Sequence, residues 1–175
     1  MNITKLHFAA VKSEPFQLAN DDVVFIVSGL AGILRNWSIL WRWSTISARI
    51  KLLLKIAVGR DILFGICLAG EPVSTGVLAL GHCSHYKVSP KAVVISTVGT
   101  DPPRKGQGLA TRSIMGAMNA MIARGHTEFY IDTWSDNIAM QQVIEKLGIW
   151  QLIACDPESR DYAARTCRDD APKTA

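Results

Sequence analysis

The stretch of sequence that decides the fold reads Thr100-Asp101-Pro102-Pro103-Arg104-Lys105-Gly106-Gln107-Gly108-Leu109-Ala110-Thr111. It lies between an apolar run typical of a strand and a pattern typical of a helix. The first turn of a helix has backbone N–H groups without internal partners, and the helix dipole adds partial positive charge there. Gly106 and Gly108 allow close approach of the backbone to an anion, and Arg104 and Lys105 add charge. The loop therefore predicts a site for a pyrophosphate group.

Two common nucleotide motifs do not fit this loop. The P-loop spacing G-x-x-x-x-G-K-[ST] is absent, and Thr111 stands where G-x-G-x-x-G requires its third glycine. A glycine pair before a helix also occurs for purely structural reasons, as a turn or a cap. The loop alone therefore leaves both a phosphate site and a structural turn open.

The segments around the loop predict strands and helices in a mixed order. After the loop, helices are expected at 109–124 and 137–147, each ended by a glycine. Between 61 and 98 a turn at 69–72 and three β-branched runs predict an antiparallel meander. We therefore expect an α/β fold of the α+β type, in which helices flank a mixed, mostly antiparallel central sheet. The expected strands are 3–9 and 23–27, either of which opens the sheet, 61–68, 73–81, 92–98, 128–133, 149–155 and 162–167.

Size and composition predict one globular domain. The chain has 175 residues, of which 49% are hydrophobic, enough for one ordinary core. A net charge of +4 is small for a dedicated nucleic-acid binder, so no nucleic-acid partner is expected. The four cysteines form no C-x-x-C pair, so no metal site is expected. No secretory signal is visible, and no apolar stretch reaches the about 20 residues of a membrane span, so we expect a cytoplasmic protein.

A basic helical segment precedes the meander, between residues 29 and 58. Apolar residues recur there at helical spacing, and every charged residue between 23 and 60 is Arg or Lys. Trp37 and Trp41 stand near arginines, which suits an amphipathic boundary. One interpretation is a solvated basic face whose aromatic residues pack into the core. The other is a substrate-side surface, over about 30–58, for an acidic substrate, an acyl carrier or a membrane.

Residues 94–149 resemble the GNAT superfamily of acyl-CoA-dependent N-acetyltransferases. The phosphate loop of that family, [Q/R]-x-x-G-x-[G/A] after a strand, is matched by residues 105–110. Its downstream element is an asparagine after the next strand, followed by a helix that ends in E-K-L-G-F. Asn137 and Glu145-Lys146-Leu147-Gly148-Ile149 match that element. The resemblance implies a GNAT-like fold and an acetyl transfer with acetyl-CoA as co-substrate and no metal.

The resemblance also implies which residues bind the donor. The strand before the loop is bulged in this family, and its backbone would pair with the pantetheine arm at Val98, Gly99 and Thr100. Asn137 would reach the pantetheine end. The loop departs from the family at its first position, so which cation meets the phosphate, at 104 or at 105, stays open. The pyrophosphate would lie on Arg104, Lys105, Gly106, Gln107, Gly108, Leu109, Ala110 and Thr111.

Acetyl transfer to an amine also requires a base. A lysine-like amine has a pKa of about 10.4, so a base or a water chain must remove a proton before attack. The glutamate that the family often carries is missing, because no acid lies between residues 86 and 100. The candidates are His82 and His85, which follow the second meander strand with Tyr86 beside them, and Asp132 on the later strand. Structural roles stay open too: strand-end hydrogen bonding for the histidines and a solvent-facing position for Asp132.

Two classes of function remain open. Many members of the family carry a tyrosine that protonates the leaving thiolate, and Ile144 replaces it here. An enzyme would move the acetyl group to a primary amine of a small molecule or a protein terminus, or would use a longer acyl donor or an acyl carrier protein. The alternative is a non-catalytic acyl-CoA-binding sensor, which the missing tyrosine and glutamate favour.

The organisation implied by the resemblance is one acyltransferase domain over residues 1–175. Within it, 1–60 is a variable substrate-side region, 61–155 the acyl-CoA-binding core and 156–175 a polar tail. The family usually closes its sheet with a hairpin that borders the acceptor. Here that hairpin is expected to be short or to come from a second subunit, which makes a homodimer possible.

Overall fold

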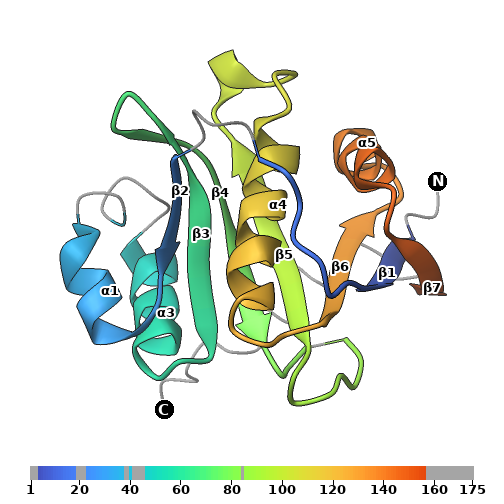
Figure 1. Cartoon of the computed structure of the whole chain (residues 1–175), viewed down its shortest axis with the longest axis horizontal. Helices are drawn as coiled ribbons and strands as arrows, with labels where there is room; N and C mark the ends of the chain where they lie inside the picture. Colours follow the sequence, from blue (N-terminus) through green and yellow to red (C-terminus); the bar gives the residue numbers. More distant parts are fainter. Residues whose placement is uncertain (1–3, 19–22, 38–39, 41–45, 84, 157–175) are drawn as a thin grey trace, which may run out of the picture.

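The computed structural model describes residues 4–18, 23–37, 40, 46–83 and 85–156. Its centre is a seven-stranded sheet in the order β2-β3-β4-β5-β6-β1-β7 (Figure 1). Neighbouring strands are antiparallel except β5 and β6, which confirms the expected mixed, mostly antiparallel sheet. The strands are β1 (Lys5–Val11), β2 (Val23–Val27), β3 (Asp61–Leu68), β4 (Glu71–Leu80), β5 (Val93–Thr100), β6 (Glu128–Trp134) and β7 (Gln151–Asp156). The helices are α1 (Gly29–Arg35), α3 (Ile46–Ala57), the 3-10 turn η1 (Pro102–Arg104), α4 (Leu109–Ile122) and α5 (Ile138–Leu147).

The β3-β4-β5 meander has the expected antiparallel pairing, but its first turn is tighter than expected. Ala69 and Gly70 both have positive φ, at 51° and 78°, and β4 already begins at Glu71. Two consecutive left-handed residues form the kind of two-residue turn whose twist matches that of paired strands. The turn expected over 69–72 therefore occupies only its first two positions.

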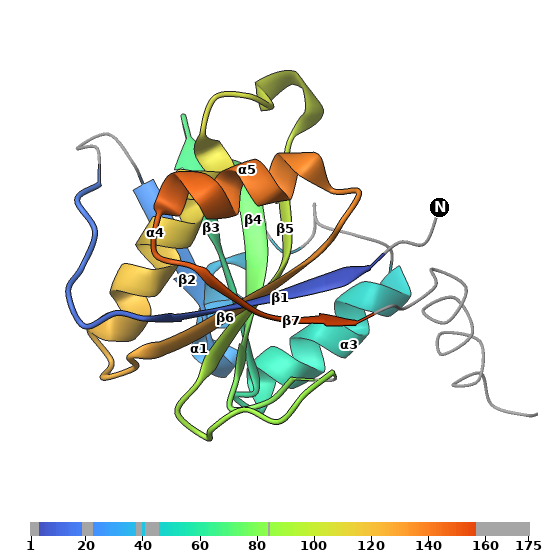
Figure 2. The same ribbon diagram turned by 90° about the vertical axis from the view of Figure 1, so that its right-hand side faces the viewer.

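Helices cover both faces of the sheet. On one face α4 packs on β3, β4 and β5, and Gly116 allows it to approach β2, since a Cβ there would lie 2.5 Å from Val24 Cγ2. On the other face α1 and α3 pack on β2, β3 and β4, as the view turned by 90° shows (Figure 2). Side chains alternate between the two faces along each strand, so the core has one part on each face of the sheet. Residues that pack under α4 include Ile62, Phe64, Leu78, Val93, Ile95, Phe129 and Ile131; those under α1 and α3 include Val27, Leu63 and Val77.

The amino-terminal strand lies far from the strand that follows it in sequence. β1 is inserted between β6 and β7 and is antiparallel to both, whereas β2 forms the opposite edge of the sheet. The connection crosses α4, where the Asn119 side chain accepts a hydrogen bond from Phe16 N at 2.6 Å and donates one to Phe16 O at 2.9 Å (Figure 1). The strand beside β6 is thus β1, from the amino-terminal end of the same chain. The strand expected at 162–167 lies outside the described residues.

Candidate active site

The site begins where β5 and β6 separate. The two strands pair only from Val93 to Ile95 on β5, so the backbone beyond Ile95 has no partner strand on that side. The pairing with β4 shifts register between Thr75 and Val77, and Thr97 has φ 53°. A β-branched residue at positive φ is strained, and such strain concentrates at functional sites. The bulge in β5 opens a groove between two parallel strands.

The loop after β5, which we call the donor loop (residues 101–111), presents backbone N–H groups at the start of α4. Gly108 is the N-cap with φ 72°, Gly106 has φ 81°, and a Cβ on either would meet no atom within 4 Å. The first bond of the helix runs from Arg112 N to Gly108 O at 3.0 Å, which leaves the preceding amides of the turn without intrahelical partners. Open space, glycine backbone and helix dipole fit an anionic group such as a pyrophosphate.

A buried hydroxyl network joins the donor loop to β4 and β5. Ser74 Oγ donates to Gly99 O at 3.2 Å, and Thr100 Oγ1 donates to Ser74 Oγ at 3.3 Å. Ser113 Oγ lies 3.1 Å from Ser74 Oγ and donates to Ala110 O at 2.9 Å. Ser74 and Ser113 are almost fully buried. The network therefore fixes the end of β5 relative to the first turn of α4.

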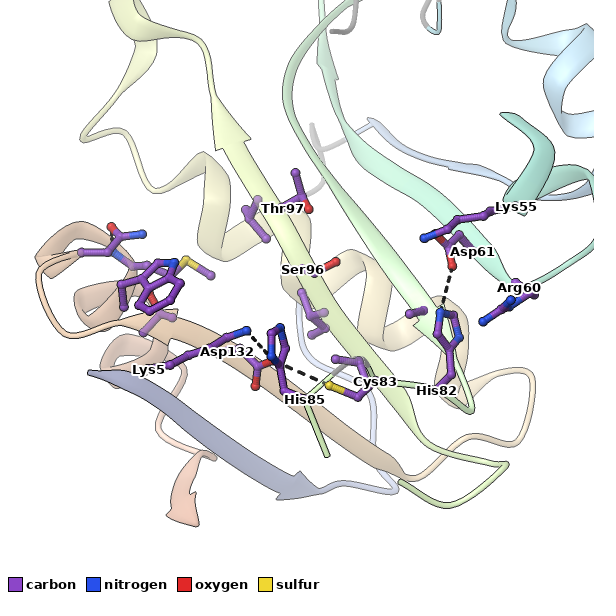
Figure 3. A pocket seen from close by; sticks show the side chains of 18 residues that line it. Lys5, Lys55, Arg60, Asp61, His82, Cys83, His85, Ser96, Thr97 and Asp132 are labelled. Atoms are coloured by element: carbon purple, nitrogen blue, oxygen red, sulfur yellow. Dashed lines mark hydrogen bonds and ion pairs between the residues drawn. The ribbon is translucent and has the colours of Figure 1, made fainter. Parts of the chain in front are cut away.

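A pocket of about 740 Å³ opens on the face of the sheet opposite α4, beside the gap between β5 and β6. Polar and charged side chains from both walls point into it (Figure 3). Asn137 lines it and also caps α5, since its Oδ1 accepts from Met140 N at 3.2 Å. The residues that line the pocket include Lys5, Lys55, Arg60, Asp61, His82, Cys83, His85, Ser96, Thr97, Val98, Asp132, Thr133 and Asn137.

Asp132 on β6 is the centre of a hydrogen-bonded cluster, which we call the Asp132 cluster: Lys5, His7, Cys83, Tyr86 and Asp132. Its Oδ1 lies 2.9 Å from His7 Nδ1 and accepts a 2.9 Å hydrogen bond from the Tyr86 hydroxyl. Its Oδ2 lies 4.0 Å from Lys5 Nζ and 3.9 Å from Cys83 Sγ. The carboxylate is only 12% exposed, so Asp132 does not face solvent.

Tyr86 is held as a neutral hydrogen-bond donor in this cluster. Burial raises its pKa far above the ordinary value of 10.0, and the charge and hydrogen bond of Asp132 raise it further. The ring of Tyr86 also contacts the buried ring of His7 edge-on, at 4.9 Å between centroids. Tyr86 and His7 therefore fix the position of the carboxylate behind the pocket.

The opposite wall carries a second carboxylate. Asp61, at the start of β3, has its Oδ2 3.5 Å from Lys55 Nζ and its Oδ1 3.6 Å from His82 Nε2. His82 Nδ1 lies 3.3 Å from Leu80 O. Asp61 is 4% exposed, and its ion pair with Lys55 joins the start of β3 to α3.

The three predicted catalytic residues line one pocket but stand at two different places. Asp132 and His85 share one end, where the His85 ring lies 6.3 Å from that of His7, and His82 lies at the other wall. Sequence reasoning missed Lys5, His7, Lys55 and Asp61. The alternation within 3–9 places Lys5 and His7 on one strand face, a signal that gains meaning only once the partner strand is known.

Other predicted site residues fall outside the pocket. Trp37, just after α1, is 49% exposed and is not among the lining residues, and Trp41 lies outside the described residues. Ile144, which replaces the tyrosine of the family, lies on α5 and is buried in the core. In the described part of the chain, no three His, Cys, Asp or Glu side chains are grouped to hold a metal ion. No helix there is long and apolar enough to cross a membrane.

Solved structures with the same fold are numerous but distant in sequence. A putative GNAT acetyltransferase from Novosphingobium aromaticivorans is 18% identical, with a TM-score of 0.58 over 87% of this chain and 61% of its own. A GCN5-related N-acetyltransferase from Sphaerobacter thermophilus is 12% identical, with a TM-score of 0.62 over 87% of this chain and 49% of its own. The chain thus spans less than two thirds of the length of either protein.

A third structure matches over nearly its full length. Aminoglycoside N-acetyltransferase AAC(6')-Iy, solved with a bisubstrate analogue, CoA-S-monomethyl-acetylneamine, is 18% identical, with a TM-score of 0.57 over 75% of this chain and 94% of its own. No curated protein matches the sequence significantly. A model of the acetyltransferase (GNAT) family matches residues 33–149, which is more than half of the chain. The chain therefore belongs to the GNAT acetyltransferase family.

Proposed function

We propose that the protein is an acyl-CoA-dependent N-acetyltransferase that moves the acetyl group of acetyl-CoA to a primary amine of a small molecule or a protein terminus. One observation carries the proposal: the groove between β5 and β6 meets a polar pocket of about 740 Å³. A thioester in the groove and an amine in the pocket would meet at that junction. Pockets of this size suit small ligands.

The donor loop would hold the pyrophosphate of the donor through its backbone amides, with Arg104 and Lys105 as nearby cations. Val98, Gly99 and Thr100 would present the unpaired edge of β5 to the pantetheine arm, with Asn137 at the end of that arm. The open space in front of Gly106 and Gly108 supports this arrangement. The binding of a CoA-containing analogue by the structurally similar AAC(6')-Iy supports it as well.

The Asp132 cluster would prepare the acceptor. The amine must lose a proton before its nitrogen attacks the thioester carbon, and the Asp132 carboxylate lines the pocket where the strands separate. As the C–N bond forms and the C–S bond breaks, the thiolate takes up one proton. His85, which lines the same end of the pocket, is our candidate for the group that gives the thiolate this proton.

Thiol release from acetyl-CoA in the presence of a panel of amines tests the proposal, run beside a direct measurement of CoA binding. Gly108→Glu should abolish both, because its carboxylate would face the pyrophosphate. Gly125→Glu is the matched control: Gly125 also has positive φ, at 88°, and open space, but it lies at the far end of α4. The control should lose stability without losing CoA binding.

The outcomes separate the enzyme from a sensor. Amine-dependent thiol release that disappears in Gly108→Glu and persists in Gly125→Glu supports the transferase. Tight CoA binding without turnover on any amine favours a sensor or a longer acyl donor, which a panel of acyl-CoA chain lengths would distinguish. Absence of CoA binding by the wild type would overturn the proposal.

A further inference from the structure

The β3 side of the pocket carries a carboxylate that the proposed transfer does not use. Asp61 lines the pocket and is 4% exposed. Its Oδ1 is buried and accepts no hydrogen bond from the part of the chain that the structure describes. A buried acceptor without a donor is costly unless a ligand or a water molecule supplies one. Asp61 Oδ1 therefore marks a place where a bound molecule can donate a hydrogen bond.

His82 borders this oxygen without satisfying it. Its Nε2 lies 3.6 Å from Asp61 Oδ1, which is too far for a hydrogen bond (Figure 3). Its Nδ1 lies 3.3 Å from Leu80 O. Leu80 O can only accept, so a hydrogen bond between it and His82 requires the donor hydrogen on Nδ1.

The charges at this wall favour an uncharged group as the hydrogen-bond donor to Asp61 Oδ1. Lys55 Nζ already lies 3.5 Å from Asp61 Oδ2, and Arg60 also lines the pocket. An ammonium group at Oδ1 would add a second positive charge beside the Lys55 ammonium on the same carboxylate, with Arg60 in the same pocket. A hydroxyl group adds no charge, donates to Asp61 and has lone pairs for Arg60.

The register of the sheet separates this wall from Asp132. One row across four neighbouring strands holds Asp61, Ala79, Val94 and Tyr130. Three strand spacings of about 4.8 Å place the backbones of β3 and β6 roughly 14 Å apart. A molecule whose amine lies at Asp132 reaches Asp61 only if a long segment joins its nitrogen to its hydroxyl.

We propose that the acceptor is an amine with a remote hydroxyl group, whose nitrogen reacts beside Asp132 and whose hydroxyl donates a hydrogen bond to Asp61. The amine end of this inference rests on the proposed acetyl transfer. The hydroxyl end rests on Asp61. The class comprises long amino alcohols and amines attached to a polyhydroxylated group, and short alkylamines are expected to be poor acceptors.

Three matched series of acceptors test the inference: n-alkylamines, amino alcohols with a terminal hydroxyl and terminal diamines, each at several chain lengths. With the wild type, the long amino alcohol should exceed the alkylamine of equal length about tenfold in kcat/KM, as a hydrogen bond to a charged group allows. The short amino alcohol should show no advantage. Asp61→Ala should remove the advantage and Asp61→Asn should reduce it; the measured quantity is the ratio of kcat/KM between amino alcohol and alkylamine of equal length, because any loss of folded enzyme cancels in that ratio.

Each contrary result has a distinct meaning. Equal kcat/KM for amino alcohols and alkylamines at every length overturns the role of Asp61 and leaves the acetyl transfer intact. A higher kcat/KM for a long diamine than for the amino alcohol of equal length overturns the inference that Asp61 accepts from an uncharged group. If no amine releases thiol, the acetyl transfer fails, and calorimetric titration with the longest amino alcohol decides the subsite alone. Binding that Asp61→Ala weakens about tenfold supports the subsite, whereas equal or absent binding overturns it.

Discussion

The donor loop and the Asp132 cluster are built in opposite ways. The donor loop uses consecutive residues, and its main feature is backbone conformation: positive φ at Gly106 and Gly108 before the first turn of α4. The Asp132 cluster uses side chains from segments far apart in sequence, since His7 and Asp132 are separated by 125 positions. A backbone site is readable in a short motif, whereas a side-chain site exists only after the strands have paired.

Removal of the Asp132 carboxylate is the largest expected effect, and it tests whether the two regions act on different substrates. Asp132→Ala should lower kcat/KM for the amine about 10²- to 10³-fold, because the variant lacks the carboxylate that we propose as proton acceptor. The KM for acetyl-CoA should change by less than about twofold, because the donor loop is untouched. Steady-state kinetics with both substrates varied measures this.

The folding control for that prediction is Asp132→Asn, which keeps an oxygen to accept the Tyr86 hydrogen bond. It should match the wild type in thermal stability more closely than Asp132→Ala and still lose most of the activity. A parallel rise in the KM for acetyl-CoA in both variants would contradict the separation of the two regions.

The second prediction concerns a substitution that disturbs the backbone of the donor loop. Gly106→Ala places a side chain at φ 81°, which costs about 1–2 kcal/mol, so the loop should relax and its amides should turn away from the donor. The KM for acetyl-CoA should rise about tenfold with kcat little changed. Gly125→Ala, at φ 88° beyond the other end of α4, should lose similar stability and keep its KM. An equal rise in KM in both variants would indicate a general loss of structure.

The third prediction sharpens the comparison through pH. The raised pKa of Tyr86 means that the folded protein keeps a proton that the unfolded chain loses above about pH 10. The contribution of Tyr86 to stability is therefore complete below about pH 10 and is lost as the pH rises further. Relative to Tyr86→Phe, the wild type should lose up to about 1.4 kcal/mol of unfolding free energy per pH unit in that range.

Urea unfolding of both proteins near pH 8 and at two values above about pH 10 measures this difference. Near pH 8 the wild type should be more stable by about 1 kcal/mol, the value of a typical buried hydrogen bond. A constant difference between the two proteins across all pH values would show that Tyr86 keeps an ordinary pKa.

The smallest effect is expected for the hydroxyl network that joins the donor loop to β4 and β5. Ser113→Ala removes the contacts with Ser74 and Ala110, which fix the donor loop relative to β5. Stability should fall by about 1 kcal/mol, and the KM for acetyl-CoA should rise about threefold with kcat for the amine unchanged. Ser96→Ala is the control. The Ser96 hydroxyl donates to Val77 O at 3.4 Å and makes no contact with the donor loop in that bond, so its loss should leave the KM for acetyl-CoA unchanged.

Most elements of the fold were predictable because their signals are local. The expected strands 23–27 and 61–68 have the observed bounds, and the helix expected at 137–147 begins one residue later, since Asn137 is its N-cap. Gly148 ends that helix with φ 63°. Alternation, capping and glycine stops each act over a few residues, so they can be read without tertiary structure.

The candidate site was predictable only in part. The sequence singled out Asp132, His82 and His85, but not that Asp132 would contact His7 or that His82 would border Asp61. Those contacts depend on β1 entering the sheet between β6 and β7. No local pattern states which strand another will pair with, because an alternating strand can pair equally well with several edges.

The sequence by itself therefore determined the order of elements, the resemblance to an acetyltransferase family and the conformation of the donor loop, because these follow from short-range backbone preferences. Only the tertiary structure decided which side chains meet in the pocket. The pairing of β1 with β6 brings Lys5 and His7 to Asp132, and the meander brings Asp61 to the far wall. Side chains distant in sequence meet only when burial of the whole sheet fixes the order and register of its strands.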